Sequence, residues 1–440
     1  MDAVITEGKK TKTHFRWVIG ALIFIIYTVA AADRANLGVA LPFLRKEFVM
    51  SNTEAGGLAS IFLFAYSLAQ LPSGLAYTRF GIPKLFSLAM LVTSVFTGLI
   101  GTATSLLMLK VYRFGLGLAE GPLPIGITST INNWFPPREK GTMTGIFLAA
   151  AKFGPVLVPP VCAVIIHYLG WRYIFYIFAL PGILLSVIWY LVVKNRPSES
   201  RFVSAEELEH INDPHGLAAK AHANTKKRDF ATLDRMIRTR KVATVEKTKD
   251  IFRSWNIMGA SLGYFFMTAI VNVLLAWIPT YLISVKNYSI TNMGLVAAAP
   301  WVGAVIGNLL GGMLTDRWLD KRRKPAMLIS AFFTTIMMVV LVNSPADPLL
   351  YGVLLLVTGV LLNIGYSTYM VYPMGMTSKQ VYPMASAMVN TLGQLGGACA
   401  PLAAGFLLDN YNWNYVWFFL AGCSILCFIT LLTIAEPKQD

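Results

Sequence analysis

Five ionisable side chains stand inside long apolar stretches of this sequence, where a charge is costly. Asp33 and Arg34 interrupt the first stretch, Arg113 and Glu120 the fourth, and Lys152 the fifth. Arginine offers a planar fork of donors that suits a carboxylate, phosphate or sulfonate, and lysine offers a point charge. A partly desolvated carboxylate can cycle between its protonated and ionised forms near neutral pH. Groups of these types at membrane depth are candidates for binding an anion and carrying a proton.

Helical spacing places some of these groups together. Arg113 and Glu120 are seven residues apart, which puts both on nearly the same helix face, about 10 Å apart along the axis. Lys152 stands about twelve residues into its stretch, which is about 18 Å deep and close to the middle of a bilayer. Three cations facing two carboxylates leave an excess of positive charge. An anionic substrate would balance this excess and protonation of a carboxylate would deepen it, so the pattern predicts coupled binding of a proton and an anion.

A second interpretation is that the charges form buried ion pairs that hold helices in register. Asp33 would then pair with Arg113, and Arg34 with Glu120. This interpretation fits Lys152 less well, because no carboxylate is left for it. The sequence leaves both interpretations open.

The apolar stretches that carry these residues are long enough to cross a bilayer. Hydrophobic residues make up 55% of the chain and charged residues 13%, against roughly 25% charged in an ordinary soluble domain. The stretches lack the polar alternation of a membrane barrel, and the longest approach or reach the roughly 20 residues that a helix needs. We therefore predict an all-α membrane protein with about twelve spans. The expected spans cover residues 16–43, 54–77, 84–105, 108–131, 140–168, 171–194, 251–283, 292–316, 325–343, 349–375, 380–408 and 412–434.

Basic residues concentrate in alternate connections between the spans. This bias predicts a multi-pass protein of the inner (cytoplasmic) membrane with both termini and the polar segment 195–250 in the cytoplasm. The net charge of +15 then reflects topology and not nucleic-acid binding. The polar segment separates six spans in residues 1–194 from six in residues 251–440, and we interpret it as a solvated linker.

The sequence gives little sign of enzyme chemistry. All four cysteines lie within expected spans, which argues against a disulfide framework or a zinc site. The chain has no HExxH, Walker-type or CxxC motif. We expect no catalytic residue, no metal and no cofactor. The expected partners are a small organic anion, protons and the lipid bilayer, with the protein acting as a monomer.

The two halves resemble each other, as parallel repeats of a transporter should. The sequence Trp-Arg-Tyr-Ile-Phe that begins at Trp171 recurs as Trp-Asn-Tyr-Val-Trp from Trp413. Upstream, Lys152-Phe-Gly-Pro with a later proline corresponds to Gln394-Leu-Gly-Gly with a proline at the same offset. Matched aromatics, glycines and prolines indicate an internal repeat.

The loop sequence from Gly311 to Arg317 resembles the signature of the major facilitator superfamily. In that signature small residues allow close helix approach, and Asp and Arg charges latch the cytoplasmic face. The resemblance implies two pseudo-symmetric bundles of six helices, with Asp316, Arg317 and, in the first copy, Arg79 as gating residues. The first copy departs from the signature, since it has Thr78 where Asp is usual.

The motifs Asp33-Arg-Ala-Asn and Arg113-x-x-x-Gly-x-x-Glu120 resemble the anion:cation symporter family. That family includes bacterial galactonate and hexuronate carriers and vesicular glutamate and sialic acid carriers. The resemblance implies that Asp33 and Glu120 couple protons and that Arg34 and Arg113 are arginines of a central cavity. It also implies that the first, fourth and fifth spans pack around that cavity.

The same resemblance assigns further substrate contacts. Tyr66 matches a tyrosine that lines the cavity, and Asn390 matches a polar residue that binds sugar-acid hydroxyls. Lys152 departs from the family, because sugar-acid carriers often have a neutral glutamine there, so it implies a more anionic substrate or a different hydrogen-bonding partner. Helix-to-helix hydrogen bonding is an equal alternative for the remaining candidates. These are polar or amphipathic residues of the second half, namely Gln394, Asn272 and Tyr372.

These observations favour a secondary active transporter that imports a small organic anion with protons by alternating access. The expected substrate is a sugar acid, such as an aldonate or a hexuronate. An anion exchanger or a carrier of sulfonates or dicarboxylates is the alternative, and Lys152 favours it.

Overall fold

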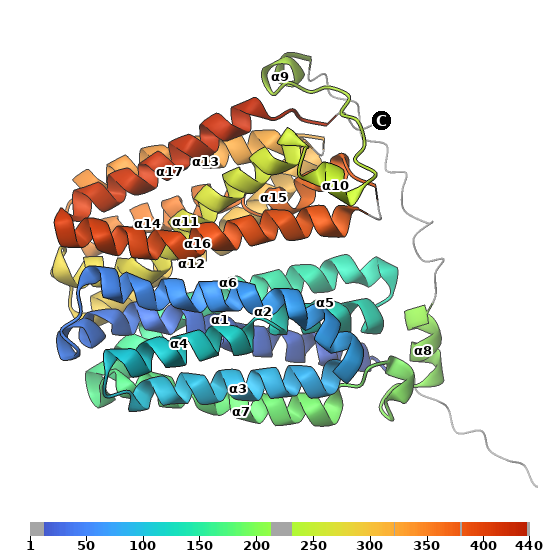
Figure 1. The fold of residues 1–440 in the computed structure, drawn as a ribbon, viewed down its shortest axis with the longest axis horizontal. Helices are drawn as coiled ribbons and strands as arrows, with labels where there is room; N and C mark the ends of the chain where they lie inside the picture. Colours follow the sequence, from blue (N-terminus) through green and yellow to red (C-terminus); the bar gives the residue numbers. More distant parts are fainter. Residues whose placement is uncertain (1–12, 213–230, 321, 379–380, 438–440) are drawn as a thin grey trace, which may run out of the picture.

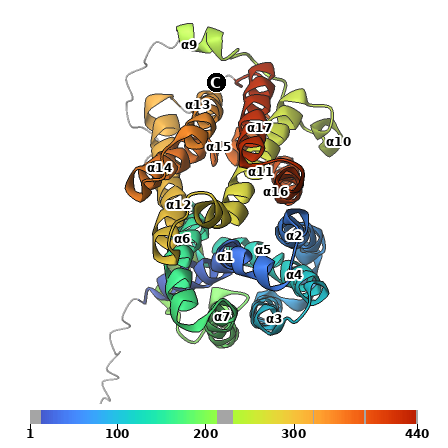
Figure 2. The same cartoon turned by 90° about the vertical axis from the view of Figure 1, so that its left-hand side faces the viewer.

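The computed structural model describes residues 13–212, 231–320, 322–378 and 381–437. These residues form helices, with two isolated β-bridges and no strand among them. Figures 1 and 2 show two helix bundles side by side, one from the first half of the chain and one from the second. The all-α prediction is therefore confirmed.

The first bundle contains seven helices. They are α1 (Phe15–Glu47), α2 (Asn52–Phe80), α3 (Ile82–Thr102), α4 (Leu106–Glu120), α5 (Leu123–Trp134), α6 (Pro137–Leu169) and α7 (Arg172–Val192). The described parts of the linker contain four short helices, η1 (Pro197–Glu199), α8 (Ala205–Asn212), α9 (Ala231–Met236) and α10 (Thr248–Ile251).

The second bundle repeats this pattern of long helices. Its elements are α11 (Trp255–Ser284), α12 (Ile290–Met313), η3 (Leu314–Trp318), α13 (Lys324–Asn343), α14 (Pro348–Ile364), α15 (Thr368–Val371), η4 (Tyr372–Gly375), α16 (Tyr382–Asn410) and α17 (Trp413–Thr433).

Ten helices of the described chain are long and apolar enough to cross a membrane, or eleven if the bent helix α2 is included. The span expected at 108–131 is divided between α4 and α5. The division falls at Gly121 and Pro122, because proline has no N–H to donate to the preceding turn. Many large apolar side chains on the outer helix faces are exposed, such as Leu184 and Leu191 on α7, which suits contact with lipid. The chain is a multi-pass membrane protein, and the count of twelve spans stays a prediction.

The two bundles meet at one end of the molecule. We call the end that carries α8, α10 and the last described residues the linker end, and the opposite end, with the turns after α1, α11 and α16, the far end (Figure 1). Near the far end, a Cβ on Gly56 of α2 would overlap the carbonyl oxygen of Pro401 on α16. On the other side of the interface, a Cβ on Gly294 of α12 would crowd the carbonyl oxygen of Pro159 on α6. The internal repeat thus places a glycine against a proline carbonyl twice.

The first part of the linker is fixed to the first bundle by Glu207 of α8, whose side chain is fully buried. Its carboxylate accepts hydrogen bonds from the Thr13 hydroxyl at 2.6 Å and from the backbone N–H groups of Phe15 and Arg16 at 2.9 and 3.0 Å. The Arg16 guanidinium also pairs with it and with Glu139 of α6. Burial alone would raise the pKa of Glu207, but these donors outweigh it and hold that pKa below its usual value. This part of the linker therefore packs against the first bundle, whereas the sequence predicted a solvated linker.

We expect the substitution Glu207→Ala to release α8 and to lower the melting temperature of the purified protein. Loss of hydrogen bonds to a buried carboxylate costs about 1–3 kcal/mol. Because the folded-state pKa is lowered, the stabilisation is complete at neutral pH and is lost as the pH falls through that lowered pKa. Melting curves and limited proteolysis between pH 7 and acid pH measure both effects. Glu206→Ala, which removes an exposed carboxylate next to it, is the control and should leave both unchanged.

Candidate functional site

A buried ion pair joins α1 to the end of α4. Arg34 Nε donates to Glu120 Oε1 at 2.7 Å, and Arg34 Nη2 lies 2.6 Å from the same oxygen. The Glu120 side chain is fully buried, whereas that of Arg34 is 22% exposed. The other carboxylate oxygen, Oε2, is buried and accepts no hydrogen bond from the described residues. The structure thus contains one of the two ion pairs considered from the sequence, and it leaves one oxygen of that pair without a donor.

Two aromatic rings of α2 cover the arginines. The Arg34 guanidinium lies 4.5 Å from the centre of the Tyr66 ring, and that of Arg113 lies 4.5 Å from the centre of the Phe62 ring. The negative face of an aromatic ring attracts a cation, most strongly where water is excluded. Phe62 and Tyr66 are one helical turn apart, so α2 presents both rings to the arginines. The structure therefore brings Tyr66 to Arg34.

Arg113 does not pair with the carboxylate of Asp33. Its Nε donates to the backbone oxygen of Leu58 at 3.2 Å, and its Nη1 to the backbone oxygen of Asp33 at 3.5 Å. The Asp33 carboxylate instead accepts from Asn36 Nδ2 at 3.3 Å. Arg113 and Asp33 are each 2% exposed. The expected Asp33–Arg113 pair is thus absent from the described residues, because backbone carbonyls take the donors of Arg113.

Lys152 of α6 reaches the second bundle. Its Nζ lies 4.4 Å from the centre of the ring of Tyr366, which follows α14. Tyr366 in turn packs against Tyr264 of α11, with ring centres 5.1 Å apart. Lys152 and Arg34 are close enough for their positive charges to repel, and Lys152 forms no ion pair with any described carboxylate. The structure therefore places a cation without a balancing anion where the two bundles meet.

Three of the four remaining candidates from the second half lie on α11 and α16, and the fourth, Tyr372, lies elsewhere. Asn390 and Gln394 are half-buried and one turn apart on α16, and Asn272 of α11 lies against the same helix at Gly397. Asn272 Nδ2 donates to the Thr268 carbonyl of its own helix at 2.9 Å, so this bond is not the helix-to-helix hydrogen bond of the alternative. Tyr372 is different. It is 1% exposed and its hydroxyl donates to the carbonyl of Ala435, beyond the end of α17, so the structure does not bring it to the charged cluster.

Two of the three expected gating residues have described side chains, and the contacts described for them lie within their own bundle. Asp316 pairs with Arg323 at 2.8 Å. The Arg79 guanidinium lies 5.5 Å from the ring of the neighbouring Phe80. The side chain of Arg317 lies outside the described residues.

Sequence reasoning did not find Phe62 and Tyr366. The spacing of Phe62 from Tyr66 could have indicated a shared helix face, since residues four apart lie on the same side of a helix. Tyr366 had no comparable signal, because only the packing of the two bundles brings it to Lys152.

The fold and the charged cluster can now be compared with known proteins. A family model described as the Major Facilitator Superfamily matches residues 23–401 and 353–440. The chain belongs to the major facilitator superfamily. It is thus a membrane transporter by family and not an enzyme, as the sequence predicted.

Similar major facilitator proteins span the whole chain. A probable L-galactonate transporter of Escherichia coli (strain K12) is 28% identical and covers 95% of this chain and 90% of its own. A probable galactarate/D-glucarate transporter of Bacillus subtilis (strain 168) is 25% identical over 99% of this chain and 94% of its own. Among solved structures, a bacterial homologue of the lysosomal transporter Spinster, inward-facing and occupied, aligns with a TM-score of 0.73 at 15% identity. That alignment covers 96% of each chain and shows the fold.

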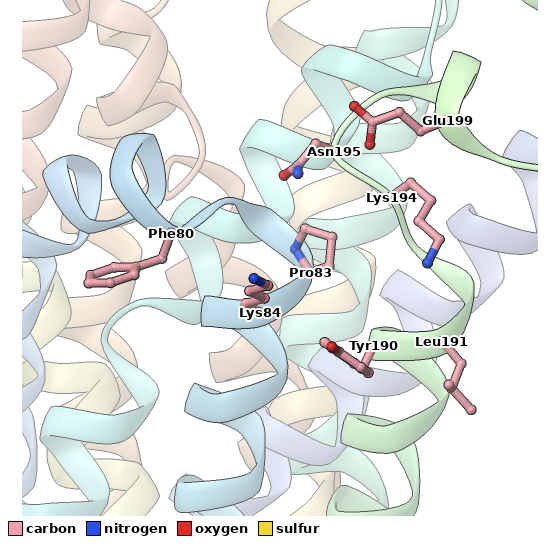
Figure 3. A pocket seen from close by; sticks show the side chains of 8 residues that line it. All are labelled: Phe80, Pro83, Lys84, Tyr190, Leu191, Lys194, Asn195 and Glu199. Carbon is pink, nitrogen blue, oxygen red and sulfur yellow. The ribbon is translucent and has the colours of Figure 1, made fainter.

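One pocket of this major facilitator lies apart from the cluster. It has a volume of about 340 Å³ and lies at the linker end between the start of α3 and the end of α7. Figure 3 shows Lys84 and Lys194 among its lining residues, with Asn195 and Glu199 beyond them. Since its walls come only from the first bundle and the linker, it does not belong to the interface that holds Lys152.

Two glycines let α4 approach α2 closely enough to form the cluster. A Cβ on Gly117 would overlap the carbonyl oxygen of Phe62, and a Cβ on Gly121 would lie 2.8 Å from that of Tyr66. Both glycines therefore allow the end of α4, which carries Glu120, to lie close against α2. A larger residue would push the helix that carries the carboxylate away from the helix that carries the rings.

We expect Gly117→Ala to separate α4 from α2 and to reduce transport at least tenfold, because overpacking of this kind costs about 1–3 kcal/mol and shifts the backbone. Uptake by cells, normalised to the amount of protein in the membrane, measures the effect. Gly145→Ala on α6 is the matched control, because a Cβ there meets nothing within 4 Å. Equal activity of the two variants would show that close approach at Gly117 is not required.

Proposed function

We propose that this major facilitator is a secondary active transporter that takes up an organic acid, most simply a sugar acid, together with protons. The observation that carries the proposal is the buried Arg34–Glu120 pair beside the unbalanced charge of Lys152. The names of the similar transporters, for L-galactonate and for galactarate or D-glucarate, support a sugar acid as the substrate.

The ion pair offers a simple exchange of partners. A proton on the unpartnered Oε2 of Glu120 would neutralise the carboxylate and weaken its hold on Arg34. Arg34, which is partly exposed, would then be free to bind the carboxylate of the substrate through its donor fork. Loss of the proton would restore the pair and displace the anion. Proton and anion would therefore bind together and leave together.

The contacts of the other charged residues define their proposed roles. Lys152 stands at the interface and would bind the anion directly, with Asn390 and Gln394 facing sugar hydroxyls from the second bundle. Arg113 is buried against backbone carbonyls and the Phe62 ring, so it would act on the site through its charge. Asp33, buried near it without an ion pair, is a second proposed proton carrier.

The direction of opening follows from the distribution of basic residues. The first and last described residues and the described parts of the linker lie at the linker end, which the positive-inside rule assigns to the cytoplasm. The bundles meet at the far end, so the structure would correspond to a carrier closed toward the outside. Rocking of the bundles about the site between them would give alternating access.

A second candidate function is exchange of anions, or transport of a sulfonate or dicarboxylate. Lys152 favours it, because a second cation near Arg34 would suit a substrate with two negative groups. Galactarate and glucarate each carry a carboxylate at both ends, so the name of one similar transporter agrees with this candidate.

We expect Glu120→Gln to abolish accumulation driven by a pH gradient, because the amide cannot gain and lose a proton. The measurement is uptake of radiolabelled galactonate and galactarate into proteoliposomes with and without the gradient. Counterflow should survive better than accumulation, since binding and rocking need no net proton movement. Glu199→Gln in the separate pocket is the control. Accumulation that needs no gradient and is unchanged in Glu120→Gln would contradict proton coupling.

We expect Lys152→Gln to separate the two candidate functions. A lost charge contact with the substrate is worth about 1.5–3 kcal/mol, or a factor of roughly 10 to 100 in apparent affinity. If the substrate has two negative groups, galactarate uptake should fall by this factor while galactonate uptake changes little. Competition by unlabelled acids against the labelled one measures the ratio. An equal loss for both acids would mean that Lys152 contacts a group common to them.

A further inference from the structure

The start of α2 is completed by a residue of the other bundle. The first four N–H groups of a helix have no partner within the helix. Ser51 and Glu54 satisfy two of these groups as a capping box, since Ser51 N donates to the Glu54 carboxylate and Glu54 N donates to the Ser51 hydroxyl, both at 3.1 Å. The other two N–H groups belong to Asn52 and Thr53 and donate to the carboxylate of Asp409, near the end of α16, at 2.7 and 2.8 Å.

The side chains of the same two residues add to this contact. Asn52 Nδ2 donates to Asp409 Oδ1 at 2.8 Å, and Thr53 Oγ1 donates to Oδ2 at 2.6 Å. Each carboxylate oxygen thus accepts two hydrogen bonds from α2. Among the described residues, all hydrogen bonds between the first and the second bundle end on Asp409. The positive charge of Arg45 on α1 also attracts the Asp409 carboxylate across the interface.

Close packing of the two backbones holds the carboxylate in place. A Cβ on Gly405 of α16 would overlap the carbonyl oxygen of Asn52, and one on Gly56 of α2 would overlap that of Pro401. Figure 2 shows α2 and α16 side by side along the interface. Glycine at both positions lets the last turns of α16 lie directly against the first turns of α2, with Asp409 at the positive end of the α2 dipole.

The other contact between the bundles has no such carboxylate. There Pro159 of α6 takes the place of Pro401, and Gly294 of α12 takes the place of Gly56. Asp409 follows Pro401 by eight residues, and the residue eight places after Pro159 is His167. The described contact of His167 is with the ring of its neighbour Tyr168, and a serine caps α12 within its own bundle. The two copies of the repeat therefore share the backbone contact, but among the described residues only the copy at α16 adds a carboxylate that binds the other bundle.

We propose that Asp409 is a gating residue that stabilises the conformation closed at the far end. When the bundles separate there, the Asp409 carboxylate and the two N–H groups of α2 lose their hydrogen bonds to each other and bind water instead. Loss of a side chain that caps a helix start costs about 0.5–2 kcal/mol, which shifts the ratio of closed to open forms about two- to thirtyfold. This inference does not rest on the identity of the substrate or on the proton.

The test measures the separation of the bundles directly. Spin labels are placed at Leu107 and Leu349, which are 70% and 79% exposed at the far-end starts of α4 and α14. The exposed Cys399 is first replaced by serine, and the full-length protein is studied in lipid nanodiscs by double electron–electron resonance. Asp409→Ala should increase the ratio of long to short distances two- to thirtyfold. His167→Ala, the matched control in the other repeat, should leave the ratio unchanged.

Asp409→Asn covers the case in which the alanine variant does not fold. The amide keeps the size and one acceptor oxygen but loses the charge, so the ratio should shift in the same direction by a smaller factor. The proposal would be overturned if the distance distribution of Asp409→Ala stayed as in the parent protein. If only Asp409→Asn folds, an unchanged distribution in that variant would overturn it. An equal shift in His167→Ala would also overturn it, because the effect would then belong to packing at this end and not to the carboxylate.

Discussion

A carboxylate inside an apolar helix bundle cannot be hydrated, so its charge must be met by the protein or removed by a proton. Glu120 meets this constraint through Arg34, and breaking a buried pair by removing one partner costs about 3–5 kcal/mol. The elements around the pair are arranged so that it can form. Helix α4 ends at Glu120 before Pro122, Gly117 and Gly121 bring that end to α2, and the Tyr66 ring covers the arginine. One oxygen of the carboxylate has no donor among the described residues, and this is the oxygen that the proposed mechanism protonates.

The two bundles contribute different chemistry to the interface between them. Around Lys152 the first bundle supplies the charges and the second adds rings and amides, of which Tyr366, Asn390 and Gln394 are the described examples. At the far end it is the second bundle that supplies a charge, that of Asp409. Lys152 crosses this division, because its ammonium group rests on a ring of the other bundle. Any anion that binds Lys152 competes with that ring. A bound substrate would therefore alter a contact between the bundles, which is a physical link between occupancy and movement.

The sequence predicted the features that depend on composition and local spacing. Apolar length predicted the helices, and the high cost of a charge at membrane depth was enough to single out Arg34, Glu120 and Lys152. The alternative pairing of Asp33 with Arg113 does not occur among the described residues, where Arg113 donates to backbone carbonyls that leave no trace in a residue pattern. Tyr372 and Tyr366 could not be ranked, because both are tyrosines of one segment and only packing decides which meets Lys152. Span boundaries agree where helices are continuous, whereas at Gly121 and Pro122 the span expected at 108–131 is divided into α4 and α5.

The two copies of the internal repeat share their backbone contacts between the bundles, but they differ in the side chains at the edge of those contacts. Both copies keep a glycine against a proline carbonyl, so the same close backbone contact lies on both sides of the interface. Side chains at the rim of the contact can then differ between copies, as Asp409 and His167 do. A single carboxylate on two N–H groups is weak enough to be broken in each cycle and strong enough to change a population by an order of magnitude. Conformational balance in this carrier would thus be adjusted at an exposed rim, at a distance from the buried pair of Arg34 and Glu120 that is proposed to bind the proton.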